Sequence, residues 1–254
     1  MLNNLLNSFE PISLDEMDNV KLMDRTDTKY TFHSEILPTV LEQLKDSYRV
    51  LRINDTYQSN YKTLYYDTNE LSLYYKHHSG KLNRYKVRHR SYVDSNIGFL
   101  EVKFKNNKGR TIKDRIKNNE VLLQWTEEAR HFLAKKTPYL PDTLVPNLWV
   151  NYSRITLVNK TSNERLTIDL NLEFIKGDRE KSMKSLVIAE VKQEKNQPSR
   201  FKELMKQLRI REGSISKYCM AVALTGEQVK INSFKAKLIQ LQKITQHDSI
   251  TNSR

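Results

Sequence analysis

The stretch Arg84-Tyr85-Lys86-Val87-Arg88-His89-Arg90 decides how this chain folds. Successive side chains of a β-strand point to opposite faces, so a strand here would place four cations on one face and Tyr85 and Val87 on the other. Four neighbouring cations repel one another, which argues against a packed core on that face. The stretch therefore predicts a strand whose charged face meets solvent or a polyanion.

The composition of the whole chain agrees with a polyanionic partner. The chain has 254 residues and is 38% hydrophobic, which is enough for one large domain with a core. Lys and Arg number 43 against 30 Asp and Glu, a formal net charge of +13. Such a balance indicates nucleic acid, an anionic membrane or phosphate-rich molecules as partners, with a solvated basic surface as the alternative.

Cysteine usage and hydropathy set further limits. Cys219 is the single cysteine, which excludes an intrachain disulfide and a Cys-based zinc motif. Its apolar neighbours predict a small buried side chain. No run of about 18 apolar residues occurs, so no transmembrane helix is expected. We expect a reducing, cytoplasmic setting, with association at the membrane periphery left open.

Segments of period two recur along the chain and predict strands. They are residues 27–33, 57–67, 82–92, 99–105, 110–117, 148–158, 164–174 and 186–192. In 164–174 the alternation is strict and predicts that Asp169, Asn171 and Glu173 share a face. Helical periodicity lies between the strands, at a helix that Ser34 would cap, at 126–136, at a helix that Ser199 would cap and at 233–246.

These segments predict an α+β fold, namely an antiparallel eight-stranded β tunnel (barrel) with a charged interior, flanked by helices that cover its apolar faces. Such a lining is tolerated when it is solvated or holds a ligand of opposite charge. The expected organisation is a helical or extended lead-in at 1–23, the tunnel domain at 24–225, and an amphipathic helix and tail at 226–254.

Eight short motifs follow one another along the chain. They are Arg25-Thr26-Asp27-Thr28-Lys29-Tyr30, Tyr65-Tyr66-Asp67-Thr68, Arg84-Tyr85-Lys86-Val87-Arg88-His89-Arg90, Leu100-Glu101-Val102-Lys103-Phe104-Lys105, Asn151-Tyr152-Ser153-Arg154, Arg165-Leu166-Thr167-Ile168-Asp169, Ala189-Glu190-Val191-Lys192 and Ser214-Ile215-Ser216-Lys217-Tyr218. In this order they resemble the triphosphate tunnel metalloenzymes of the CYTH-like superfamily, and more closely the VTC-type polyphosphate polymerase domain.

The resemblance implies a tunnel that binds ATP and inorganic polyphosphate, with Mn²⁺ or Mg²⁺ held by a glutamate. The implied reaction moves the γ-phosphoryl group of ATP onto a growing polyphosphate chain and releases ADP. Two positions depart from the pattern. Thr26-Asp27-Thr28-Lys29 stands where the wider superfamily often has Glu-x-Glu-x-Lys, which favours the polymerase branch over the hydrolytic one. Ser214 replaces a basic residue common in polymerase relatives.

Matching motif to motif assigns roles to particular side chains. Arginine suits phosphate because its planar fork makes paired hydrogen bonds. The resemblance places six cations around the triphosphate: Lys29, Arg88, Arg90, Lys103, Arg154 and Arg165. It adds four substrate contacts: Lys86, Tyr152, Ser216 and Lys217. Glu190 is the expected metal ligand, with Glu101 as the second candidate.

Each assignment has a plainer alternative. Arg88 and Arg90 would also suit a surface strand, and Tyr152 an ordinary wall position. Glu190 and Glu101 could each form a salt bridge with an inner cation, for example Glu101 with Lys103. Ser216 and Lys217 fall on opposite faces of a strand, so both reach one ligand only if their segment is helical, bent or at a tunnel rim.

Other functions remain as alternatives. One is hydrolysis of triphosphate or polyphosphate in the same tunnel, and another is a non-catalytic binding module, including one that partners a membrane protein. A nucleic-acid binder is not expected, because single-strand binders stack bases on aromatic side chains and Tyr85 falls on the face opposite the cations. The sequence leaves open whether the C-terminal helix from Ser233 plugs the tunnel or binds a partner.

Overall fold

The computed structural model describes residues 2–18, 25–194 and 197–245. Its strands are β1 (Glu10–Ile12), β2 (Arg25–His33), β3 (Tyr48–Leu51), β4 (Ser59–Asp67), β5 (Arg84–Tyr92), β6 (Ile97–Lys105), β7 (Thr111–Lys117), β8 (Val145–Asn159), β9 (Glu164–Lys176), β10 (Arg179–Met183), β11 (Leu186–Glu194) and β12 (Glu212–Gly213). Its α-helices are α1 (Leu2–Asn7), α2 (Leu14–Asp18), α3 (Leu37–Leu44), α4 (Ser72–His78), α5 (Glu127–Lys136), α6 (Arg200–Gln207), α7 (Lys217–Thr225) and α8 (Lys235–Thr245). Short 3₁₀ helices are η1 (Ser34–Ile36), η2 (Val93–Ser95), η3 (Pro141–Thr143) and η4 (Asn232–Phe234). The α+β class and all eight predicted strands are confirmed.

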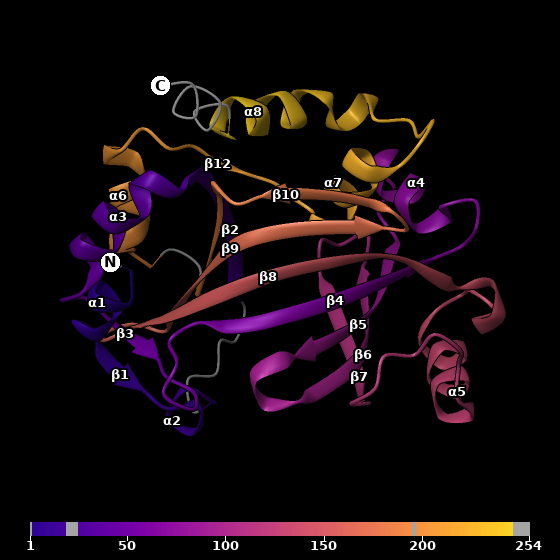
Figure 1. Cartoon of the computed structure of the whole chain (residues 1–254), viewed down its shortest axis with the longest axis horizontal. Coiled ribbons are helices and arrows are strands. Elements are labelled where there is room, and N and C mark those ends of the chain that lie inside the picture. The colour runs from indigo at the N-terminus through magenta and orange to yellow at the C-terminus, as the bar shows by residue number, and fades with distance from the viewer. Residues whose placement is uncertain (1, 19–24, 195–196, 246–254) are drawn as a thin grey trace.

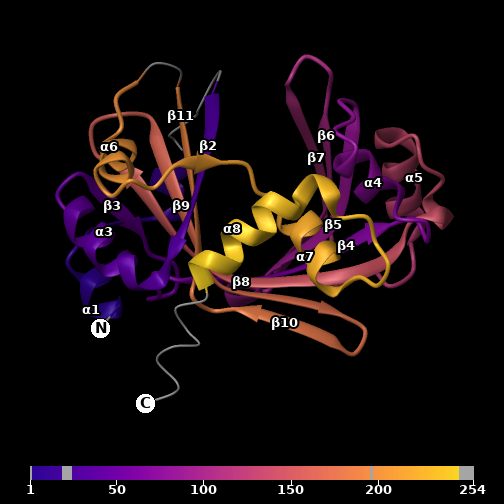
Figure 2. The same ribbon diagram turned by 90° about the horizontal axis from the view of Figure 1, so that it is seen from above.

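The strands form a single curved sheet. Its order is β12-β2-β11-β9-β8-β4-β5-β6-β7, and each strand on this path is antiparallel to its neighbours. The short β1 and β3 pair in parallel beside β8. In the described part of the sheet no ladder joins β7 to β2 or β12. The sheet therefore has two walls, β2–β11–β9 and β5–β6–β7, which are joined by β8 and β4 (Figures 1 and 2).

The outer faces of both walls are apolar and covered by helices. On the first wall, Leu41 of α3 and Phe201 of α6 pack on Ile168 and Val187 of the sheet. On the second wall, Leu133 of α5 belongs to the cluster that contains Val87 and Leu100. Burying one such side chain stabilises a fold by about 1.5–3 kcal/mol. The period-two alternation predicts this arrangement, with apolar residues on the outer face and charged residues on the inner face.

Helix α7 covers part of the inner face. Its Tyr218 and Met220 lie in one cluster with Val150, Phe174 and Ile188 of the sheet. The helix is apolar on nearly all sides, with six of its residues buried, as expected for a helix surrounded by protein. Cys219 is among them and is 2% exposed, which confirms the predicted burial. The charged lining therefore occupies the part of the inner face that α7 leaves open.

The strict alternation predicted for 164–174 is wrong beyond Leu170. Asn171 adopts a left-handed conformation (φ 52°), and the β8–β9 register shifts between Asn151 and Ser153. A bulge inserts one extra residue and exchanges the faces that follow it. Glu173 consequently accepts a hydrogen bond from Asn151 (Nδ2–Oε2 2.7 Å) and does not join Asp169 on the inner face.

The helix starts follow the expected capping chemistry with one exception. The hydroxyl groups of Thr126 and Ser199 cap α5 and α6. Ser34 is not a cap: it is the first residue of η1, and the His33 ring accepts from the Glu35 backbone (3.3 Å). The predicted helix at 233–246 is observed as η4 and α8, while Gln246 lies outside the described residues.

Segments on both sides of 24–225 pack against the sheet domain. Leu6 and Phe9 are buried in the cluster beneath α3, and Leu241 of α8 is buried beside α7. Helix α8 itself lies against β2 and β11. Among the described residues, no helix combines the length and the apolar character that a bilayer crossing requires.

Candidate functional site

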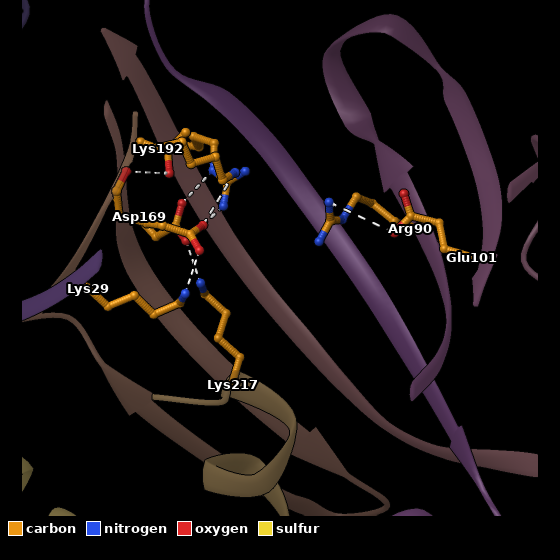
Figure 3. A network of polar contacts seen from close by, with 9 residues as sticks. Lys29, Arg90, Glu101, Asp169, Lys192 and Lys217 are labelled. Carbon is orange, nitrogen blue, oxygen red and sulfur yellow. Dashed lines mark hydrogen bonds and ion pairs between the residues drawn. The ribbon is translucent and has the colours of Figure 1, made fainter. Parts of the chain in front are cut away.

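Three carboxylates on the inner face each hold a set of cations. They are Glu101 on β6, Asp169 on β9 and Glu190 on β11. Figure 3 labels Glu101 and Asp169 together with four of the inner cations. The partners of the three carboxylates are Arg88, Arg90, Arg154, Lys217, Lys29 and Lys192. These six cations keep between 13% and 28% of their side-chain surface exposed. They are thus neither core residues nor freely solvated, and a ligand on this face can reach them.

Asp169 joins β8 to the start of α7. Arg154 donates to both carboxylate oxygens (Nε–Oδ1 2.6 Å, Nη2–Oδ2 2.9 Å), and Lys217 Nζ bonds Oδ2. Burial alone would raise the pKa of the Asp169 carboxyl, but Arg154 and Lys217 lower it to about 2. The charged carboxylate therefore orients two of the predicted phosphate contacts, Arg154 and Lys217.

Glu190 lies between two lysines. Lys29 on β2 bonds Oε1, and Lys192 approaches Oε2 (3.4 Å). Burial would raise the pKa of Glu190, but Lys192 and Lys29 hold it well below its usual range. Lys192 was not assigned a role from the sequence. Its spacing of two residues from Glu190 already placed both side chains on one face of the strand, so its position at the site could have been predicted.

Glu101 orients two arginines of β5. Arg88 Nε lies 2.6 Å from Oε2, and Arg90 Nη1 lies 4.0 Å from the same oxygen. Burial opposes the charged form, yet Arg88 and Arg90 lower the pKa of Glu101 to about 2. The alternative that Glu101 and Glu190 form salt bridges with inner cations is therefore observed for both. The predicted partner of Glu101 is wrong, because β6 places Glu101 directly opposite Arg88 and Lys103 opposite Lys86.

Lys86 and Lys103 differ from these six cations because neither forms an ion pair with a carboxylate in the described structure. Among the described residues none lies within ion-pair distance of either, and Lys86 instead donates to Ser216 Oγ (2.8 Å). Burial, with neighbouring cations, lowers the pKa of each lysine to about 8. Lys29 on β2 adds to the lowering at Lys103 on β6. The lysines of the two walls are thus close enough for the charge of one to lower the pKa of the other, and both face the same space.

Ser216 and Lys217 reach the same space because their segment is helical. Ser216 is the N-cap of α7, and its hydroxyl accepts from the Cys219 backbone (3.3 Å). Tyr218, two residues after Ser216, bonds Asp67, which also caps α4 by accepting from Leu73 N (2.8 Å) and Tyr74 N (2.9 Å). The buried Asp67 therefore fixes where α7 begins.

Tyr152 is a wall residue in this structure. Its ring stacks on Tyr61 (centroids 5.0 Å apart, planes 2° apart) and lies below the cations of Arg154 (5.4 Å) and Lys217 (4.7 Å). Arg165 lies on β9 directly opposite Lys192 of β11, at the end of the charged face away from α7. The structure thus places the predicted cations on one face.

The donor set fits a divalent metal that is shared with a ligand. The described residues hold no group of three His, Cys, Asp or Glu side chains arranged for a metal ion. Mg²⁺ and related ions are commonly bound by one or two carboxylates together with substrate phosphates and water. Glu190, ionised and partly exposed, can supply one such carboxylate once a phosphate competes for Lys29 and Lys192.

Comparison with known proteins gives one family and several loose structural likenesses. The family model described as the VTC domain matches residues 24–225. No curated protein matches. A structure from Hippeastrum, named as a candidate adenylyl cyclase with dominant triphosphatase activity, is 16% identical with a TM-score of 0.47, over 81% of this chain and 98% of that one. A candidate adenylate cyclase from Bacillus halodurans is 14% identical with a TM-score of 0.44, over 76% and 96%.

Proposed function

The chain belongs to the VTC domain family, and from that premise we propose that it is a metal-dependent polyphosphate polymerase. Its substrates are ATP and inorganic polyphosphate, and its products are ADP and a chain longer by one phosphate. The observation that carries the proposal is the inner face itself, on which cations of both walls and of the α7 N-terminus surround one shared space.

Phosphoryl transfer places few covalent demands on a protein. It needs the reacting oxygens in line and the charge of the phosphate oxygens offset. A terminal oxygen of polyphosphate attacks the γ-phosphorus of ATP, the bond from that phosphorus to the β,γ-bridging oxygen breaks, and ADP leaves with the electron pair. The attacking oxygen is already ionised near neutral pH, so no general base is required.

The proposed roles follow the observed contacts. Arg88, Arg90 and Arg154, each oriented by a carboxylate, hold the triphosphate through paired hydrogen bonds. Lys29, Lys103 and Arg165 complete the ring. Lys86, Tyr152, Ser216 and Lys217 border the same ligand from the wall and from the start of α7.

Glu190 would hold Mn²⁺ or Mg²⁺ together with phosphate oxygens, and the ion would supply charge compensation at the transferring group. Glu101 is the second candidate, but both of its neighbours are arginines that it positions. Thr26-Asp27-Thr28-Lys29 lacks the carboxylates of Glu-x-Glu-x-Lys, and this departure favours transfer over metal-dependent hydrolysis.

The test is incubation of the purified chain with ATP and Mn²⁺, followed by gel electrophoresis with polyphosphate staining and by ADP measurement. A ladder of long chains with matching ADP is expected. Arg88→Ala and Glu190→Gln should abolish it, and Lys62→Ala and Glu180→Gln, which remove the same charges from exposed positions, should not.

Two outcomes would contradict the proposal. Orthophosphate without long chains would identify a hydrolase in the same site. Tight binding of tripolyphosphate without turnover, seen as a raised melting temperature, would identify a binding module.

A further inference from the structure

Two cations extend the charged face beyond the proposed triphosphate ring. On β5 the row Arg90, Arg88, Lys86 continues to Arg84, and on β6 the row Glu101, Lys103 continues to Lys105. The register sets Arg84 directly opposite Lys105, and the next pair inward is Lys86 opposite Lys103. Like charges directly opposite each other destabilise a pair of strands. Two such pairs in succession therefore need an explanation.

The extension is not neutralised within the chain. No Asp or Glu occurs between Glu70 and Asp94 or between Glu101 and Asp114. In the part of the chain that the structure describes, no carboxylate forms an ion pair with any of these four cations, whereas Arg88 and Arg90 share Glu101. Arg84 is held by a hydrogen bond from Nη1 to the Lys81 carbonyl (3.0 Å). An anion from outside is the missing partner.

The pair is fixed in place from behind. Tyr85 and Phe104, also opposite each other, stack on the other face of the two strands (centroids 4.5 Å apart, planes 19° apart). The turn beside them is tied to the start of β5 by a hydrogen bond from Asn107 N to Asn83 Oδ1 (3.0 Å). The stacked rings keep Arg84 and Lys105 turned towards the side of the inner cations.

A histidine adds a polar group beside the same cations. His77, near the end of α4, has a buried Nδ1 without a hydrogen-bond partner in the described structure. Its pKa falls to about 3, through burial first and then through the charges of Lys86, Arg84 and Lys105. Those charges therefore act on a common neighbour, and a bound anion would offset their mutual repulsion.

The length of the row indicates which anion fits. Six residues separate Arg84 from Arg90, or about 20 Å at about 3.3 Å per residue in a strand. This is longer than a triphosphate. At the Arg84 end of the row, the rings of Tyr85 and Phe104 lie on the opposite face, so nucleic-acid bases find no stacking surface beside Arg84 and Lys105. That end of the row matches an unbranched, repeating anion without bases.

We infer that Arg84 and Lys105 form a chain-extension subsite, which binds the part of a long polyphosphate that continues past the triphosphate ring, at the end of the inner face next to α4. The inference rests on the proposed function, because it assigns a path to the polymer that function would make. It predicts that affinity depends on chain length through two residues outside the ring.

The experiment measures binding without ATP or turnover. Calorimetry compares tripolyphosphate with a long-chain polyphosphate on the unmodified chain, on Arg84→Ala/Lys105→Ala and on the control Lys181→Ala/Lys184→Ala, which removes two exposed cations from the β10 region. The first double variant should bind the long chain about tenfold more weakly and leave tripolyphosphate affinity unchanged. The slope of log affinity against log salt for the long chain should fall by about one to two. The control should change neither value.

Several results would overturn the inference. They are equal losses for both ligands, no loss for the long chain, and equal competition by a single-stranded oligonucleotide at the same phosphate concentration. Arg84→Gln/Lys105→Gln, which keeps the length of both side chains, guards against a folding defect in the alanine pair. If the unmodified chain binds both ligands but makes no polymer from ATP, the proposed function fails while the subsite stands.

Discussion

Asp169→Asn tests whether the carboxylates of the inner face hold its cations in place. Asp169 is 3% exposed and serves Arg154 and Lys217 together. Burial opposes its charge, yet these two cations lower its pKa from 3.8 to about 2. At about 1.4 kcal/mol per pKa unit, the charged carboxyl contributes about 2 kcal/mol to stability. Leaving two buried cations without their anion raises the cost of the substitution to about 3–5 kcal/mol.

The measurement is calorimetric unfolding at pH 7. For a chain of this length each kcal/mol shifts Tm by about 2–4 °C, so Asp169→Asn should lower Tm by about 6–20 °C. The control is Asp114→Asn, because Asp114 pairs with Lys136 (2.5 Å) with both side chains about one-third exposed. Such a surface pair is worth about 0–1 kcal/mol.

The pH dependence of the same variant gives a second check. The folded pKa of Asp169 is depressed, so its contribution is complete above the unfolded pKa of about 3.9 and is lost as the pH falls through about 2. The gap in Tm between the unmodified chain and the variant should therefore narrow below about pH 4. Equal melting of Asp169→Asn and Asp114→Asn at pH 7 would refute the reasoning.

Two further predictions concern Ser216 and the lysines without carboxylates. Ser216→Ala and Ser199→Ala each remove an N-cap and should each lose about 1 kcal/mol, but only Ser216→Ala should weaken tripolyphosphate binding severalfold, because Ser216 also holds Lys86. Melting and calorimetric binding check this, and equal binding by the two variants would contradict it. Burial lowers the pKa of Lys86 and Lys103 to about 8, and a bound phosphate should raise both, so binding at pH 8 should take up protons and weaken as the pH rises further. Calorimetry in buffers of different ionisation enthalpy checks this, and identical heats in all buffers would show that neither lysine meets the ligand.

The strands were predictable because their chemistry repeats at the period of the structure. In Arg84–Tyr92 the cations alternate with Tyr85, Val87 and His89, and the structure sets these two groups on opposite faces. The predicted boundaries differ from the observed ones by a few residues, because strand ends depend on tertiary pairing more than on composition.

The bulge at Asn171 and the position of α7 could not be predicted in the same way. Nothing in Asp169-Leu170-Asn171-Leu172 breaks the alternation, and the extra residue is visible only against β8. Helix α7 is apolar almost all round, which indicates burial but does not say on which side of a sheet. Both features depend on contacts between segments far apart in the sequence.

The position of the candidate residues on the inner face was predictable from the sequence, but the ion pairs between them were not. Period-two spacing and the motifs placed Glu101, Glu190 and the cations on the inner face, where the structure has them. The partner of Glu101 depends on the β5–β6 register, which sets Arg88 opposite it. Lys217 meets Asp169 only because Ser216 starts a helix there, which strand periodicity does not reveal.

In the described sheet the two end strands are not joined by a ladder, so α7 and the side chains of the inner face set the separation of the two walls. In a barrel closed by backbone ladders the diameter is fixed by strand number and stagger. Here Lys103 of β6 and Lys29 of β2 face a shared space, and no ladder in the described sheet ties their walls together. Repulsion between the walls is strongest in dilute buffer and weakens with salt or with a bridging phosphate. We expect the separation of the two walls to depend on ionic strength, and small-angle scattering at several salt concentrations can measure this dependence.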